Sequence, residues 1–339
     1  MSFTQRLQEI REGFERPFWV ANITETFERL SYYGQNTVLA IYLHRNLHFT
    51  ETQAGDLTGY FGGVVWFLPI LGGALADRIG FRRSLSFAYL ILSVGYFLMG
   101  SLSAPWMAPA RNAVPLYWLV LAILTVPALG PSIVKPVVVG TTARASAENV
   151  RSIGYSIYYT LVNVGGMLGP LMADFVSRRA GLESVFRASA LSVFVMFFAV
   201  VLFFKEPGGS REQRVASLPQ AFKNMMTVMG GRVFLAAAVA LVLKIASLFL
   251  RFHVPVWVWL GLLALALISL NRFMLFLVIF SGFWVVFWQE FISLPLYITD
   301  YVNPNFRLGL LLTVDPLMVI CFQLAVRSEE RRVGKECRL

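Results

Sequence analysis

The sequence is poor in cysteine, histidine and charged residues, and each shortage excludes a class of protein. Only 2 of its 339 residues are Cys and 3 are His. Cys321 lies in an apolar run and Cys337 in a polar tail, so neither a disulfide framework nor a cysteine-based metal site is supported. Charged residues make up 14% of the chain, hydrophobic residues make up 57%, and the mean hydropathy is +0.65. A soluble domain needs more charged surface, so a lipid bilayer is the expected solvent.

Long apolar runs take the place of the missing charge, and their lengths predict membrane spans. A bilayer core of roughly 30 Å requires about 20 helical residues. The chain is therefore expected to be an all-α polytopic membrane protein. Ten predicted spans lie at 18–43, 53–78, 84–103, 114–140, 153–176, 185–205, 232–251, 254–271, 273–298 and 308–326.

The net charge of +10 is explained by membrane orientation better than by nucleic acid binding. The basic residues form no patch interleaved with stacking aromatics, so no nucleic acid partner is expected. Most of them fall on one side of the predicted membrane, which the positive-inside rule makes cytoplasmic. The N-terminus lacks the apolar core of a cleavable signal peptide and is expected to stay on that side. Arg178, Arg179 and Arg187 are the exceptions, on the opposite side.

Two polar segments divide the chain. Residues 1–205 are expected to form a six-helix bundle, and the polar, glycine-containing segment 206–231 a cytoplasmic linker. The tail 327–339, RSEERRVGKECRL, matches the translation of a common sequencing adapter up to about Cys337, and such scars are excluded from fold reasoning. The protein is then expected to continue beyond Val326, and the chain as given to be inactive. The alternative is an ordinary basic cytoplasmic tail.

The first predicted span, FWVANITETFERLSYYGQNTVLAIYL, carries charges in its middle. Glu25, Glu28, Arg29, Tyr32 and Asn36 lie at i, i+3, i+4, i+7 and i+11, which is one stripe of a helix. A charge at mid-membrane costs about 2.5 to 3.5 kcal/mol, so these groups are expected to face the bundle interior and pair. Two carboxylates beside one guanidinium leave one carboxylate free to exchange Arg29 for a proton, which is proton-relay chemistry. A static buried ion pair is the alternative.

The turn after the second span, GGALADRIGFRRS, has the features of a gate. Glycines permit a tight turn and a close approach of two helices. Asp77 can bind a helix N-terminus or a basic residue in one conformation only. A basic loop that merely sets topology is the alternative. The gate residues are Gly73, Asp77, Arg78, Gly80, Arg82 and Arg83.

These two motifs carry a family resemblance. GGALADRIGFRRS resembles the loop signature GxLaDrxGrrx of the major facilitator superfamily. ETFERLSYYG resembles the ExxER motif of the proton-dependent oligopeptide transporter family, whose members are proton-driven symporters of di- and tripeptides, with nitrate and other solutes in some branches. The resemblance implies a major facilitator fold, alternating access, a proton gradient as driving force with no cofactor, and no enzyme activity.

The resemblance also implies a substrate site. Lys135, before Pro136, matches a family lysine that contributes to substrate carboxylate binding and coupling, so proton coupling is assigned to Glu25, Glu28, Arg29 and Lys135. From the residues alone, Lys135 could instead extend to the membrane surface, and Tyr159 is more often a packing residue. The implied substrate-binding residues are Tyr32, Tyr33, Asn36, Trp66, Lys135, Tyr159, Asn163, Trp284, Gln289 and Glu290.

The ninth span, FSGFWVVFWQEFISLPLYI, resembles the family's seventh core helix, with Trp284 and Gln289 at matching positions. Residues 232–271 would then be an extra helical pair, and 272–326 the first two helices of a truncated second bundle. Trp288 stands where many peptide transporters have an acidic residue, and Glu290 lies about 100° away around the helix. Gln35 and Asn36 also replace a common basic residue. Both departures put dipeptide specificity in question.

The remaining polar residues give weaker signals. Asp315, before Pro316, is either an extra titrating group or a residue in a hydrated cavity. His44 and His48 are spaced i, i+4 without an evident carboxylate partner, so no metal site is expected. An integral-membrane enzyme would need a polar catalytic cluster at an interface, whereas these charges lie along helix interiors.

The sequence thus predicts a proton-coupled symporter of di- and tripeptides, monomeric, in the plasma (inner) membrane of a bacterium. A permease for nitrate or another small anion and a non-transporting sensor remain the alternatives. Glu28→Gln is expected to abolish proton-driven uptake and to spare exchange.

Overall fold

The described part of the protein is mostly helical. The computed structural model describes residues 12–207, 223, 226, 227, 230–250, 252–268 and 272–322, and no strand occurs among them. Phe14 and Ser146 form an isolated β-bridge. The chain divides into two compact units, Met1–Gln213 with Glu290–Leu339, and Arg214–Gln289. The tail 327–339 and most of the predicted linker 206–231 lie outside the described residues.

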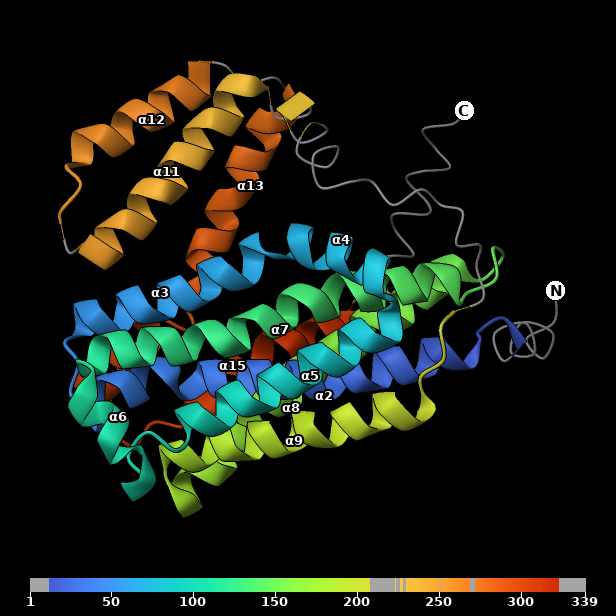
Figure 1. Ribbon diagram of the computed structural model, residues 1–339, viewed down its shortest axis with the longest axis horizontal. Helices are drawn as coiled ribbons and strands as arrows, with labels where there is room; N and C mark the ends of the chain where they lie inside the picture. The colour runs from blue at the N-terminus through green and yellow to red at the C-terminus, as the bar shows by residue number, and fades with distance from the viewer. Residues whose placement is uncertain are drawn as a thin grey trace. The chain divides into compact units, whose positions relative to one another are not determined.

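The first unit contains the six predicted N-terminal spans as helices (Figure 1). The longest helices are packed side by side, with α2 against α8 and α9, and α5 against α7 and α9. The all-α membrane fold predicted from the sequence is confirmed. The helices are α2 (Arg16–Ile41), α3 (Glu51–Phe67), α4 (Pro69–Ile79), α5 (Phe81–Met99), α6 (Ala108–Ala113), α7 (Leu116–Arg144), α8 (Arg151–Ala180) and α9 (Leu182–Phe203).

The same unit includes shorter elements in both of its chain segments. A π-helical turn, η1 (Tyr42–Asn46), continues α2, and a 3-10 turn, η2 (Pro105–Met107), precedes α6. After residue 289 come α14 (Ser293–Tyr297), a second π-helical turn η3 (Ile298–Val302) and α15 (Leu308–Leu312). The ninth and tenth predicted spans are therefore helical but interrupted.

The second predicted span is broken instead of continuous. Thr50 and Gln53 form a capping box that starts α3, and the chain bends by 48° between α3 and the residues from Leu71 onward. Pro69 stands at the first position of α4, where its missing N–H is tolerated. The hydropathy of the sequence predicted the span but not this bend.

Length and composition alone identify three described helices that can cross a membrane, Leu116–Arg144, Leu182–Phe203 and Leu275–Val302. The bent pair of α3 and α4 makes a fourth. α2 is long enough but holds three charged residues, Glu25, Glu28 and Arg29, near its middle. Its place in the bundle therefore depends on how these charges are buried.

Glycines bring α2 and α8 into close contact. A Cβ on Gly165 would lie 2.4 Å from Thr26 O, and one on Gly169 would lie 2.6 Å from Leu30 O. Gly34, on α2, faces the same stretch. Small residues four apart let two backbones approach in a membrane, where packing rather than hydrophobicity drives association. This approach places the charged middle of α2 against α8.

Replacement of Gly169 by alanine is expected to destabilise the protein by about 1 to 3 kcal/mol, because the added methyl group must push a backbone carbonyl away. The midpoint of thermal unfolding in detergent measures this loss. Gly63→Ala is the matched control, since no atom lies within 4 Å of its Cβ position and alanine is the better helix former. Equal midpoints for the two variants would contradict the close helix contact.

The second unit contains α11 (Gly231–Leu250), α12 (Val256–Ile268) and α13 (Arg272–Trp288). α11 packs against α12, and much of the apolar surface of α13 is exposed, including Ile279 and Val286. The unit boundary at residue 289 differs from the expected boundary between 271 and 272. The division into 1–205, 206–231, 232–271, 272–326 and 327–339 stays a prediction.

Candidate functional site

A fully buried ion pair occupies the middle of α2. Arg29 donates to both carboxylate oxygens of Glu28, with Nε 2.5 Å from Oε2 and Nη2 2.9 Å from Oε1. Glu28 is 0% exposed and Arg29 is 4% exposed. The bidentate geometry is the strongest form of this pairing. Glu28 is therefore the carboxylate that forms the ion pair with Arg29.

Glu25 is the carboxylate of this stripe that forms no ion pair in the described part of the chain. It is 1% exposed. Its Oε1 accepts a hydrogen bond from the hydroxyl of Tyr158 at 3.3 Å, and its Oε2 has no hydrogen-bond partner among the described residues. A buried carboxylate with an open oxygen can hold a proton at little cost in hydrogen bonds. The sequence left open whether Glu25 or Glu28 is free, and the geometry singles out Glu25.

Tyr158 is a site residue that the sequence analysis missed. The sequence analysis chose Tyr159, whose side chain is 55% exposed. The neighbouring Tyr158 instead donates a hydrogen bond to Glu25. The signal was available, because Tyr158, Gly165 and Gly169 are spaced i, i+7 and i+11 and so share the face that packs on α2.

Aromatic rings surround the ion pair on α2. The guanidinium of Arg29 lies 4.7 Å from the ring centroid of Tyr32, and that ring stacks on Phe61 of α3 at 6.0 Å. The ring of Tyr33 lies 5.4 Å from that of Tyr32 and 5.8 Å from that of Phe291. Tyr32 therefore borders the charged centre and Tyr33 lies next to Tyr32, while their roles in substrate binding stay predictions.

Lys135 and Trp66 also come together as a pair. The Nζ of Lys135 lies 4.0 Å from the ring centroid of Trp66, a cation–π distance. Within the described residues no carboxylate oxygen lies within ion-pairing distance of Lys135. This half-buried ammonium group is held by a ring that an anionic ligand could displace.

Two other predicted substrate residues form their side-chain hydrogen bonds within their own helices. Asn36 accepts a hydrogen bond from Gln35 at 2.9 Å, and the amide of Asn163 donates to Tyr159 O at 2.8 Å on its own helix. Glu290 is half-buried at the start of the second segment of the first unit.

Trp284 and Gln289 belong to the second unit, so they are described only by their own surroundings. The side chain of Gln289 donates to Val285 O at 3.3 Å, and Trp284 is 39% exposed. Their roles in binding stay predictions.

The predicted gate turn is held by an ion pair and a carboxylate cap. Asp77 Oδ1 lies 3.1 Å from Nη2 of Arg144, whose guanidinium lies 4.5 Å from the ring of Phe81. Glu206, after α9, accepts from the backbone N–H groups of Phe81 and Arg82 at 3.2 and 3.0 Å. A carboxylate is favoured at this helix N-terminus by the helix dipole.

Glycine positions shape the same turn. Gly80 has φ +95, which side chains rarely adopt. The closest approach to α7 occurs at Gly72, whose Cβ would lie 2.2 Å from Ser132 O, whereas a Cβ on Gly73 would lie 3.3 Å from Pro136. Gly73 is the glycine named among the predicted gate residues, and the tighter contact is one residue earlier.

An ion-pair cluster at the opposite end of α8 was not predicted. Asp174 binds Arg178 at 2.9 Å and Arg307, just before α15, at 2.8 Å. A Cβ on Gly309 would lie 2.3 Å from Pro170 O, so α15 lies directly on α8. The sequence gave no signal for this pairing, since Asp174 and Arg307 are far apart in the chain.

Comparison with known proteins decides the family. A sequence profile of the Major Facilitator Superfamily matches residues 23–339. The chain belongs to the Major Facilitator Superfamily. The family agrees with the loop signature GGALADRIGFRRS, which predicted it.

Curated relatives of this superfamily member are peptide permeases. It is 26% identical over 245 residues to dipeptide and tripeptide permease B of Salmonella typhimurium, covering 69% of this chain and 47% of the relative. It is 27% identical over 250 residues to dipeptide and tripeptide permease A of Chromobacterium violaceum, covering 71% and 46%. The chain thus spans about half the length of the curated relatives it matches.

Solved structures share the fold. A POT family transporter in complex with a thioalcohol-conjugated peptide matches with a TM-score of 0.67 at 18% identity, covering 95% of this chain and 71% of that one. A POT family transporter in complex with 5-aminolevulinic acid matches with the same TM-score, covering 94% and 71%. The major facilitator fold that the motifs implied is confirmed by these structures.

Proposed function

We propose that the protein is a proton-coupled symporter of di- and tripeptides that works by alternating access. The observation that carries the proposal is the buried Glu25 beside the Glu28–Arg29 pair, because an unpaired carboxylate in a membrane bundle is costly unless it has a function. Related permeases named for dipeptides and tripeptides support the substrate class.

In the proposed cycle Glu25 carries the proton. Protonation of Glu25 removes a negative charge beside Arg29, and this changes the strength of the buried Glu28–Arg29 pair. Lys135 exchanges the ring of Trp66 for a substrate carboxylate, and Tyr32, Tyr33, Asn36, Tyr159 and Asn163 border the substrate. Trp284, Gln289 and Glu290 are further substrate-binding residues in this proposal.

The gate turn is proposed to close the cytoplasmic side through Asp77 and Arg144. The protein would lie in the plasma (inner) membrane of a bacterium as a monomer, with a cytoplasmic N-terminus, as the distribution of basic residues favours. Its driving force would be the proton gradient, with no cofactor. Its partners are protons, a small peptide and the surrounding lipid.

A second candidate function is a proton-coupled permease for nitrate or another small anion. It is favoured by Trp288, which stands where many peptide transporters have an acidic residue that could receive a peptide amino group. Lys135, without a carboxylate partner among the described residues, could bind a small anion equally well.

Uptake of a labelled dipeptide separates these functions. The full-length protein is reconstituted into liposomes, and uptake is measured with and without an inward proton gradient. We expect uptake that depends on the gradient and is competed by unlabelled dipeptide but not by nitrate. Uptake of nitrate without uptake of the dipeptide would favour the anion permease, and binding without uptake would favour a sensor.

A further inference from the structure

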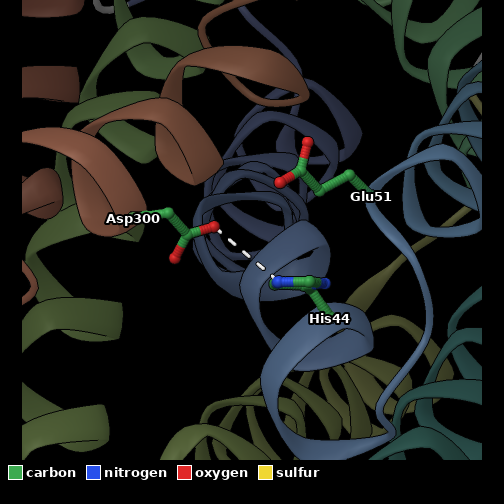
Figure 2. A group of neighbouring side chains, drawn as sticks. All are labelled: His44, Glu51 and Asp300. Atoms are coloured by element: carbon green, nitrogen blue, oxygen red, sulfur yellow. Dashed lines mark ion pairs between the residues drawn. The ribbon is translucent and has the colours of Figure 1, made fainter.

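A histidine and two carboxylates converge at one end of the first unit. His44 lies on η1, Glu51 is the first residue of α3, and Asp300 lies on η3. One ligand atom of each lies within 4.8 Å of the others, and Figure 2 shows the three side chains directed into one space. The sequence analysis expected no carboxylate partner for His44, and that expectation is wrong.

Packing holds this juxtaposition in place. The end of α2 and the segment containing α14, η3 and α15 share a buried apolar cluster. Its members are Ala40, Ile41, Leu296, Ile298 and Leu308. The cluster lies beside η1 and η3, so His44 and Asp300 are brought together by the fold and not by a chance contact of mobile side chains.

The hydrogen bonding of His44 leaves one ring nitrogen available. Its Nδ1 lies 2.7 Å from Phe49 O, and a carbonyl oxygen only accepts, so Nδ1 carries a proton. In the neutral ring Nε2 then presents a lone pair, and it faces Asp300 Oδ2 at 3.7 Å, beyond hydrogen-bonding distance. A backbone carbonyl behind the distal nitrogen is the usual support of a metal-binding histidine.

The charges around the cluster favour a cation. Arg45 donates to Asp300 Oδ1 at 2.7 Å and to Thr299 O at 2.8 Å. It therefore orients Asp300 with Oδ2 toward His44. One guanidinium opposes the two carboxylates of Asp300 and Glu51, so one negative charge remains when His44 is neutral.

We propose that His44, Glu51 and Asp300 bind one divalent transition-metal ion of the zinc type. Zinc bonds of about 2.0 to 2.2 Å in tetrahedral geometry hold ligand atoms roughly 3.4 Å apart, close to the 3.7 Å between His44 and Asp300. Glu51 is exposed and reaches the ion by a side-chain rotation. An imidazole ligand selects zinc over magnesium or calcium, and water completes the coordination.

The bound ion ties together segments that are distant in sequence. His44 and Glu51 flank the turn between α2 and α3, whereas Asp300 belongs to the segment that follows residue 289. The ion would fix η3 to this turn, adding to the ion pair between Arg45 and Asp300. The ion would therefore stabilise the packed arrangement of the first unit.

Zinc titration of the purified protein in detergent, by competition with a coloured chelator, tests the proposal. We expect one zinc ion per chain. His44→Ala or Asp300→Asn should weaken zinc affinity by at least about 100-fold, because removing a ligand should cost more affinity than removing a residue that only hydrogen-bonds to a ligand. Glu51→Gln changes an exposed side chain and should weaken binding by about 10-fold or more. Zinc should also raise the unfolding temperature of the unsubstituted protein but not of Asp300→Asn.

The other two histidines of the chain provide matched controls. His48→Asn and His253→Asn are expected to bind zinc like the unsubstituted protein. The proposal fails if no zinc binds, which would leave an ion-pair contact only, or if His44→Ala binds as tightly as His48→Asn. Because no readout uses transport, either result is independent of the proposed function.

Discussion

Replacing Glu25 with glutamine is expected to abolish uptake driven by a proton gradient while sparing exchange of substrate across the membrane. Glutamine keeps the size of the side chain and can still accept the hydrogen bond from Tyr158, so it resembles the protonated carboxyl group. It cannot release a proton, and the cycle can then run only in its protonated form. Counterflow exchange into liposomes should therefore persist at a rate near that of the unsubstituted protein.

The assay compares driven uptake and counterflow for the same preparation. Glu148→Gln is the matched control, because Glu148 is exposed on the turn between α7 and α8, and it should retain both activities. Driven uptake by Glu25→Gln would show that Glu25 is not the proton carrier. Loss of both activities in a folded variant would place Glu25 in substrate binding instead.

The second large effect concerns stability. Glu28→Gln is expected to lower the free energy of unfolding by about 3 to 5 kcal/mol, because removal of one partner leaves the buried guanidinium of Arg29 uncompensated. Both oxygens of Glu28 accept from Arg29, and Glu28 is 0% exposed. A large fall in the midpoint of thermal unfolding in detergent would measure this loss.

Glu183→Gln is the control for that measurement. Glu183 pairs with Arg187 at 3.1 Å on α9, and the Arg187 side chain is 47% exposed. Such surface pairs contribute about 0 to 1 kcal/mol, so this variant should unfold near the unsubstituted protein. If Glu28→Gln unfolds at the same temperature as Glu183→Gln, the buried pair does not stabilise the bundle.

These two expectations revise the prediction made from the sequence. The ExxER stripe showed that Glu25, Glu28 and Arg29 share a face, and it predicted loss of driven uptake for Glu28→Gln. It did not show which carboxylate holds Arg29, since side-chain rotamers decide that. Glu25→Gln is the clearer test of coupling, because a failure of Glu28→Gln would also follow from unfolding.

Local patterns predicted most of the fold, and long-range packing supplied the rest. Apolar runs of span length located the helices, since hydropathy and helix period are written in neighbouring residues. Tyr158 could have been placed from the glycine stripe of α8. The pairs Asp174–Arg307 and His44–Asp300 could not, because they depend on how α15 and η3 pack against the first bundle.

The bend between α3 and α4 and the π-helical turn η1 show the same limit. Pro69 marked a possible break, but hydropathy continues through it, and prolines inside α7 at 127, 131 and 136 leave that helix continuous. A proline thus ends a helix only where the surrounding packing does not restore its lost hydrogen bond.

The cap that Glu206 places on α5 makes a closed loop of the first bundle. α5 follows the gate turn directly, and Glu206 follows α9. The hydrogen bonds from the start of α5 to Glu206 therefore join the end of the bundle to the turn between its second and third spans. Pro207 directly follows Glu206, so the described end of the first bundle lies beside the gate turn. Loss of the Glu206 carboxylate would therefore release two parts of the bundle at once, its described end and the first turn of α5.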